Sequence, residues 1–332
     1  MAPKSMRDTY CDVLIELAQE NDAIVVLNAD LSGAVGTKRF EQNFPDRAFN
    51  MGVAEANMIG VAAGLSARGK IPFAASFAVF ASRRAFDQFF ISGNYARLNI
   101  KLVGSDPGIA AGYNGGTHMA FEDIGMMRSV PGLVIFEPCD NVSLKALVRQ
   151  SAAHNGCTYM RLYRKDGSVI YDEHENFQLG KGKVLCRGGD VTIFALGFIM
   201  VSQALKAAEM LEKAGVSATV IDMHTVKPID EELILAQAKL TNAVVTCENH
   251  QVFGGLGSAV AEVLAESGRG MLKRIGIEDE FGEVGDEAYL MERFGLTAER
   301  ICQKTIAFLE RRESRARDAE EPMTGISFDE RK

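Results

Sequence analysis

The sequence predicts an α/β protein made of two consecutive domains, each with a mostly parallel sheet. Two observations lead to this fold class. Short apolar runs rich in β-branched residues alternate with longer amphipathic runs, which is typical of strands joined by helical crossovers. The alternation stops once, in the charged, glycine-rich residues 164–189, and then resumes. The 332 residues also suffice for two domains that each bury a core.

Apolar runs such as AIVVL at residues 23–27 predict buried strands, and the amphipathic runs between them predict helices. In the first half, the expected strands are residues 23–27, 100–103, 133–136 and 158–162, and the expected helices are residues 8–20, 54–68, 82–98 and 142–153. After the break, the expected strands are residues 191–196, 218–221, 243–246 and 274–277, and the expected helices are residues 200–214, 231–239, 255–266 and 298–311. Helical crossovers imply a sheet that is covered on both faces.

These elements divide the chain into a first domain at residues 1–165, a linker at 166–189, a second domain at 190–312 and a tail at 313–332. We expect the linker to hold one or two small strands. The tail has dense mixed charge and few large apolar residues, so we expect it to be extended or disordered. A strand that docks on a partner is the less favoured alternative for the tail.

Composition excludes several classes of protein. The formal charge of −8 makes nucleic acid and anionic membranes poor partners. The most apolar stretch, residues 71–81, is too short to span a bilayer, and the first residues lack the apolar core of a signal peptide. The six cysteines form no CxxC pair, and several lie in apolar runs, so we expect reduced, buried thiols and a cytoplasmic protein without a metal site of its own.

Three segments contain candidate functional residues. In NMGVAEANMIGVAAG, Glu55 opens a helix of small residues, either to favour the helix dipole or as a desolvated carboxyl that shares a proton with a ligand nitrogen. Phe77 and Phe80 are three positions apart and share one face, either as core or as an aromatic slot. The loop at residues 104–123 is rich in glycine and contains His118, either a structural residue or a ligand contact.

In its motifs and their order, the chain resembles the C-terminal two-thirds of transketolases over roughly residues 6–311. The segments VVLNADLSG, GVAEANM, SFAVF and GGTH resemble motifs of the family's pyrimidine-binding domain. TVKPID, CENHQVFGGLGSAVAEVLAE and KRIGIEDEFGEVG resemble motifs of its C-terminal domain. The family's GDG motif, which holds magnesium and diphosphate, does not occur here. The chain therefore looks like the second subunit of a split transketolase.

The resemblance implies thiamine diphosphate as cofactor, with its aminopyrimidine half bound by this chain. It implies an N-terminal partner subunit that holds the diphosphate and Mg²⁺ or Ca²⁺, an α2β2 assembly, and a sugar phosphate as substrate. Glu55 and His118 match catalytic positions. The matching cofactor positions are Asp30, Glu55, Phe77, Phe80 and Arg83, and the matching substrate positions are Arg7, Asp106, Asn114, His118 and Arg164.

The chain departs from the family pattern at several of these positions. Arg83 replaces the third aromatic residue of the stacking motif. Ala34 stands where the phosphate site has a serine, although Ser32 is near. Asp106 aligns with a loop histidine and Asn114 with an aspartate. Arg161 is an alternative to Arg164 as the second arginine for the phosphate. A carboxylate in place of a phosphate ligand favours a less common phosphorylated sugar, or one with a different anionic end.

The reaction that we expect moves a two-carbon ketol unit from a ketose phosphate to an aldose. The nearest alternative is the β subunit of a 2-oxo acid dehydrogenase, which has the same domain pair and a similar glutamate. A fragment of a deoxyxylulose-phosphate synthase is another. A subunit that only scaffolds or regulates its partner is an alternative of a different class, against which Glu55, Phe77 and Phe80 argue.

Overall fold

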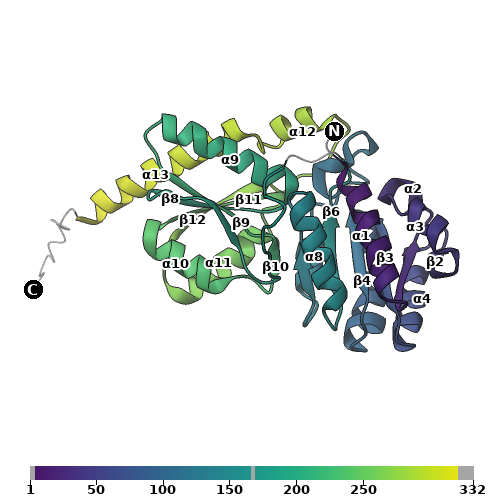
Figure 1. Ribbon diagram of the computed structural model, residues 1–332. Helices are drawn as coiled ribbons and strands as arrows, with labels where there is room; N and C mark the ends of the chain where they lie inside the picture. Colours follow the sequence, from purple (N-terminus) through teal and green to yellow (C-terminus); the bar gives the residue numbers. More distant parts are fainter. Residues whose placement is uncertain (1–3, 166–168, 321–332) are drawn as a thin grey trace, which may run out of the picture.

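Two sheets, each covered by helices on both faces, lie side by side in the computed structural model (Figure 1), which describes residues 4–165 and 169–320. The prediction of two α/β domains with mostly parallel sheets is confirmed. Within the described residues, no helix is both long enough and apolar enough to cross a membrane.

The first sheet has seven strands in the order β10-β5-β6-β4-β3-β1-β2, and all pairs except β10–β5 are parallel. Its strands are β1 (Ile24–Asn28), β2 (Ala48–Asn50), β3 (Ile71–Phe77), β4 (Lys101–Ser105), β5 (Val134–Phe136), β6 (Thr158–Leu162) and β10 (Thr225–Lys227). Its helices are α1 (Met6–Glu20), α2 (Ser32–Val35), α3 (Lys38–Asn43), α4 (Glu55–Ala67), α5 (Ala78–Arg83), α6 (Phe86–Gln88), α7 (Asp123–Arg128) and α8 (Asn141–Ala153). The short helical segments η1 (Pro45–Arg47), η2 (Phe89–Tyr95) and η3 (Gly108–Asn114) complete this part.

The second sheet has five strands in the order β12-β11-β8-β9-β7, with β7 antiparallel at one edge. Its strands are β7 (Lys183–Cys186), β8 (Val191–Ala195), β9 (Ala218–Asp222), β11 (Ala243–Gln251) and β12 (Met271–Ile277). Its helices are α9 (Gly197–Lys213), α10 (Glu231–Thr241), α11 (Leu256–Ser267), α12 (Glu287–Arg293) and α13 (Ala298–Glu320).

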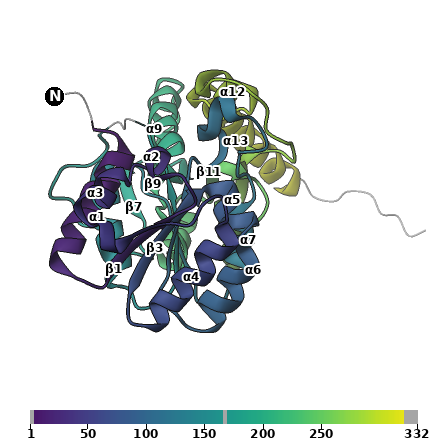
Figure 2. The same cartoon turned by 90° about the vertical axis from the view of Figure 1, so that its right-hand side faces the viewer.

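Alternate residues of each central strand enter different cores. Ile24 and Val26 pack in one core with residues of α1 and α8, and Val25 and Leu27 pack in the other with residues of α4. Figure 2 shows α1 and α3 on one side of the first sheet and α4 and α6 on the other. Both faces of this sheet are covered by helices, so all five residues of β1 (IVVLN) are buried, and four of them are apolar.

Two expectations about single elements need correction, and a third is confirmed with an addition. The helix expected at residues 82–98 is interrupted: α5 ends at Arg83, and a π-helical turn, η2, follows α6. The small strand expected in the linker is β7, which belongs to the second sheet. The helix expected to end at residue 311 continues through Glu320, so the first part of the tail is helical; residues 321–332 lie outside the described part.

One strand crosses between the two halves of the chain, and the sequence pattern did not reveal it. β10 lies in the TVKPID motif of the second half, yet it pairs antiparallel with β5 of the first sheet. The Lys227 ammonium also donates to the main-chain oxygens of Arg128 and Val130 in the first half, at 2.7 and 2.6 Å. The two domains are thus joined by a shared sheet edge in addition to the connecting chain.

Candidate active site

The expected site residues converge on the carboxyl edge of the first sheet. Phe77 is the last residue of β3, Asp106 directly follows β4, and Asp30 and Arg164 lie two positions after β1 and β6. Parallel strands deliver their ends to one edge of a sheet, where open α/β proteins bind ligands. The sequence placed Asp30, Asp106 and Arg164 shortly after expected strands, but it did not predict β3, at whose end Phe77 lies. The shared edge itself depends on the strand order.

Glu55 is the first residue of α4 and is almost fully buried, with 3% of its surface exposed. The Ser76 hydroxyl donates to Glu55 Oε1 at 3.2 Å. Arg84 Nη1 contacts both carboxylate oxygens, at 3.3 and 3.1 Å. The carboxylate therefore faces the end of β3 and the residues after α5, and not solvent.

Arg84 is a site residue that sequence reasoning missed. Its guanidinium lies 4.0 Å from the centre of the Phe80 ring while it bonds Glu55, and its side chain is 48% exposed. The signal was available: Arg84 lies four positions after Phe80, the spacing that brings two helical side chains together. Ser76 was equally missed, although it directly precedes Phe77.

The two phenylalanines and the loop histidine form one aromatic cluster. The ring centres of Phe77 and Phe80 are 6.2 Å apart. The His118 ring stands edge-on to both, at 6.0 Å from Phe77 and 5.1 Å from Phe80. His118 Nδ1 lies 2.9 Å from the Thr117 hydroxyl. Edge-to-face packing of this kind is favourable for aromatic rings, and it brings three residues expected at the site into contact.

A group of cationic side chains, Arg7, Arg164 and Lys165, which we call the cation cluster, surrounds Asp106. Arg164 Nε lies 2.8 Å from Asp106 Oδ1, and its guanidinium lies 5.9 Å from the Phe77 ring centre. Burial raises the pKa of Asp106 to about 6, against the opposing attraction of Arg164, Lys165 and Arg7. Arg7 of α1 thus acts on the same carboxylate as Arg164, which is consistent with the expectation that both arginines serve one anion.

The remaining expected residues lie at the rim. Asp30 Oδ1 accepts from the Asn50 amide at 3.0 Å, and Asn114 is exposed at the end of η3. Arg83 forms an ion pair with Glu122 and does not pair with the Glu55 carboxylate. It lines a cavity of about 730 Å³ between the loop after η3 and the segment around Gly282.

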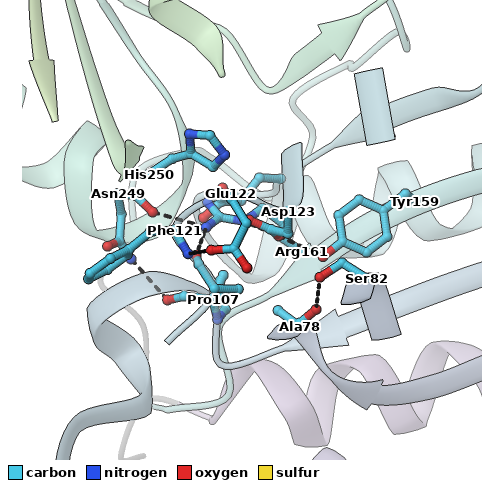
Figure 3. A network of polar contacts seen from close by, with 12 residues as sticks. Ala78, Ser82, Pro107, Phe121, Glu122, Asp123, Tyr159, Arg161, Asn249 and His250 are labelled. Carbon is cyan, nitrogen blue, oxygen red and sulfur yellow. Dashed lines mark hydrogen bonds and ion pairs between the residues drawn. The ribbon is translucent and has the colours of Figure 1, made fainter. Parts of the chain in front are cut away.

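Arg161 is not available to a substrate, so the alternative to Arg164 is wrong. It is fully buried and donates to Asp123 Oδ2 at 2.9 Å and to Glu137 Oε2 at 2.6 Å. Its remaining amino group donates to the main-chain oxygens of Ala120 and Asn249 (Figure 3). Each of the three guanidinium nitrogens thereby donates to a protein acceptor.

This buried network positions the loop that holds Asp106 and His118. The Asn249 side chain donates to the Pro107 carbonyl at 3.0 Å (Figure 3). It also accepts from the Ile109 amide at 3.0 Å. Further along the loop, a Cβ on Gly116 would lie 2.1 Å from the Gly282 oxygen, so only glycine permits this approach. The second domain therefore fixes the shape of a loop that belongs to the first.

The residues around Glu55 fit an aminopyrimidine. The Arg84 guanidinium, a flat group with nitrogen donors, contacts the buried carboxylate and lies over the Phe80 ring at once. A carboxylate and an aromatic face at this spacing can hold another flat nitrogen group. Among the described residues, no cluster of three or more His, Cys, Asp or Glu side chains could hold a metal ion.

Fold and site together define a class of two-domain α/β proteins with a buried carboxylate and an aromatic cluster at the carboxyl edge of a parallel sheet. The chain belongs to the transketolase family: the model of the transketolase pyrimidine-binding domain matches residues 2–168, and that of the transketolase C-terminal domain matches residues 180–301.

Relatives support this assignment over most of the chain. The chain is 54% identical to the 6-deoxy-6-sulfo-D-fructose transketolase subunit SqwH of Clostridium sp. strain MSTE9, over 93% of this chain and 96% of that protein. It is 34% identical to rat transketolase over 90% of this chain, but spans only 48% of that protein. A solved structure described as a split gene transketolase, inactive beta4 tetramer, has a TM-score of 0.85 at 45% identity and covers 93% of this chain and 99% of its own.

Proposed function

We propose that the chain is the pyrimidine-binding subunit of a heteromeric transketolase, which moves a two-carbon ketol unit from a ketose with an anionic end to an aldose. The observation that carries this proposal is the arrangement at one sheet edge: a buried carboxylate beside aromatic rings, with a cation cluster alongside. Glu55 provides the first part and Arg164 the second. A regulatory subunit would need neither.

Each part has a separate task. Thiamine diphosphate, when bound, supplies the carbanion chemistry of the reaction. Glu55 would share a proton with the pyrimidine ring nitrogen. The Ser76 hydroxyl donates to Oε1 of the same carboxylate. The rings of Phe77 and Phe80 would bear the flat face of the ligand, and His118, at the edge of both rings, would contact the hydroxyls of the donor.

Arg7 and Arg164 would bind the anionic end of the sugar, because guanidinium groups offer forked donors to anions. The similarity to a 6-deoxy-6-sulfo-D-fructose transketolase subunit supports a sulfonate as one such end. A relative from Phocaeicola vulgatus, named as a subunit of an apulose-4-phosphate transketolase, is 34% identical and supports a phosphate. Both names also describe subunits, which supports a partner chain, and the inactive beta4 tetramer supports self-association of this kind of chain. The assembly that we propose from the two is α2β2.

The partner would hold the diphosphate and its Mg²⁺ or Ca²⁺. The compartment that we propose is the cytoplasm, because five of the six cysteines are buried as free thiols and the sixth is half-buried.

Turnover assays test the proposal. The purified chain, the N-terminal subunit, thiamine diphosphate and Mg²⁺ are combined, and ketose donors are compared with pyruvate. We expect ketol transfer only when both chains are present. Turnover of pyruvate with no ketol transfer would instead identify a dehydrogenase or a deoxyxylulose-phosphate synthase. Calorimetry of the isolated chain adds a second check, since micromolar cofactor binding without the partner would contradict a split enzyme.

A further inference from the structure

Asp106 is an unusual component of a site for anions. It is a carboxylate with 1% of its surface exposed, and its backbone φ of 54° lies in the left-handed region. Arg164 Nε lies 2.8 Å from its Oδ1, and the Ser105 hydroxyl is 3.2 Å from its Oδ2. Asp106 thus neutralises part of the positive charge that would otherwise attract a substrate anion.

The charges of the cation cluster can be balanced pair by pair. Lys165 forms an ion pair with Glu287 at 2.8 Å, so these two cancel. Asp106 offsets one of the two arginines, Arg7 and Arg164, which both attract it. Arg7 itself makes no ion pair with any side chain that the structure describes. One net positive charge is therefore left for the substrate.

We propose that Asp106 is a specificity-determining residue, which matches the site to a ketose whose end carries one negative charge, such as a sulfonate, over a dianionic phosphate. The inference rests on the proposed function, because it assigns the cation cluster to the end of the sugar. A monoanion is neutralised by the charge that remains. A second negative charge on the ligand faces the Asp106 carboxylate without a matching cation.

The selectivity has a characteristic dependence on pH. A phosphate dianion can bind without repulsion if Asp106 takes up a proton, and burial has already raised the pKa of this carboxyl to about 6. Protonation costs tenfold in affinity for each pH unit above the pKa. The discrimination against a dianion is then about tenfold at pH 7 and about 100-fold at pH 8. A phosphate monoester loses its second proton near pH 6, so its own charge is nearly constant over that interval.

Asp106→Asn is the test variant, and Glu16→Gln is its matched control. Asparagine keeps the shape of aspartate and tolerates a positive φ, so the fold of the loop should persist. Glu16 pairs with Arg149 at 2.7 Å on the surface of α1, and its replacement removes the same unit of charge elsewhere. The assembled complex is measured with 6-deoxy-6-sulfo-D-fructose and with fructose 6-phosphate, by calorimetric Kd and by kcat/KM, at pH 7 and pH 8.

We expect the wild type to prefer the sulfonate, by a ratio that rises about tenfold from pH 7 to pH 8. Asp106→Asn should lower the ratio about tenfold at pH 7 and abolish its rise, whereas Glu16→Gln should behave as wild type. A ratio that is the same in Asp106→Asn and wild type would overturn the inference, as would an equal change in Glu16→Gln.

The two levels of the proposal can fail separately. If neither ketose is turned over but the ratio of Kd values shifts as expected, the proposed function is wrong and the role of Asp106 stands. If both are turned over with a ratio that is flat in pH, the function stands and the role of Asp106 is wrong. Should Asp106→Asn not assemble, the pH dependence of the wild type decides alone.

Discussion

Two arginines, three positions apart in the chain, have opposite environments. Arg161, within β6, is fully buried between Asp123 and Glu137. Arg164, just past the end of the same strand, is 27% exposed and faces Asp106. One arginine belongs to a closed polar network that joins the domains, and the other to an open cluster at the sheet edge. The difference teaches that residue type and spacing do not distinguish a structural arginine from a ligand-binding one.

Charge and hydration explain the contrast. A buried guanidinium loses its water and needs protein acceptors instead, and two carboxylates and two carbonyls provide them for Arg161. Burial raises the pKa of Glu137, and the neighbouring Arg161 opposes that rise. At Arg164 the guanidinium keeps access to solvent, so it can exchange water for a ligand. Variants in both regions test this division between a closed and an open environment.

The largest expected effect is on turnover at the open edge. Glu55→Gln keeps the shape of the side chain and should preserve assembly with the partner, but it cannot deliver a proton. We expect the rate to fall by about 10²–10⁴-fold, the usual range for a positioned acid or base. Exchange of the thiazolium C2 proton in deuterated buffer, followed by NMR, measures this step directly. If Glu55→Gln exchanges as fast as wild type, the open edge lacks the acid assigned to it.

The closed region should respond in stability. Arg161→Ala leaves two carboxylates buried without a cation, which costs about 3–5 kcal/mol of unfolding free energy. Arg164→Ala should cost only about 1 kcal/mol, because its pair is partly solvated and Asp106 can take up a proton. Urea denaturation of both variants measures the difference. Equal losses in the two variants would remove the distinction between the regions.

The open edge, which should contribute less to stability, should show the larger effect on kinetics. Removal of one charge-assisted hydrogen bond costs roughly 1.5–3 kcal/mol, so Arg164→Ala or Arg7→Ala should lose about 10–100-fold in kcat/KM, mainly through KM. Steady-state kinetics with an anionic ketose provide the measurement, and an uncharged ketose is the control, since it should lose little. Unchanged kinetics in both variants would make these arginines structural.

The smallest effect is expected at the rim. The Arg83–Glu122 pair is partly exposed, with side chains 45% and 32% accessible. Exposed pairs contribute at most about 1 kcal/mol, so Arg83→Ala should leave the denaturation midpoint nearly unchanged. A cofactor affinity that also stays unchanged would remove Arg83 from the expected cofactor residues, whereas a weaker affinity would keep it there.

Local sequence patterns by themselves determined much of this protein. Apolar periodicity located α4 and the central strands except β3, because burial on both faces of a parallel sheet leaves a direct mark on sequence. The resemblance in motif order identified the family. Glu55, Phe77, Phe80 and His118 were named together from three separate segments, and the structure brings the three rings into contact.

Only the tertiary structure decided which polar groups pair. Arg161 donates to a carbonyl 88 positions away, and the Asn249 side chain reaches the loop 142 positions before it. β10 joins a sheet from which it is separated by the linker. Such contacts depend on how packed elements meet, and no local period records them. The physical reason is that a helix or strand is specified by its own residues, whereas the burial and partners of a charge are specified by whatever the rest of the chain places against it.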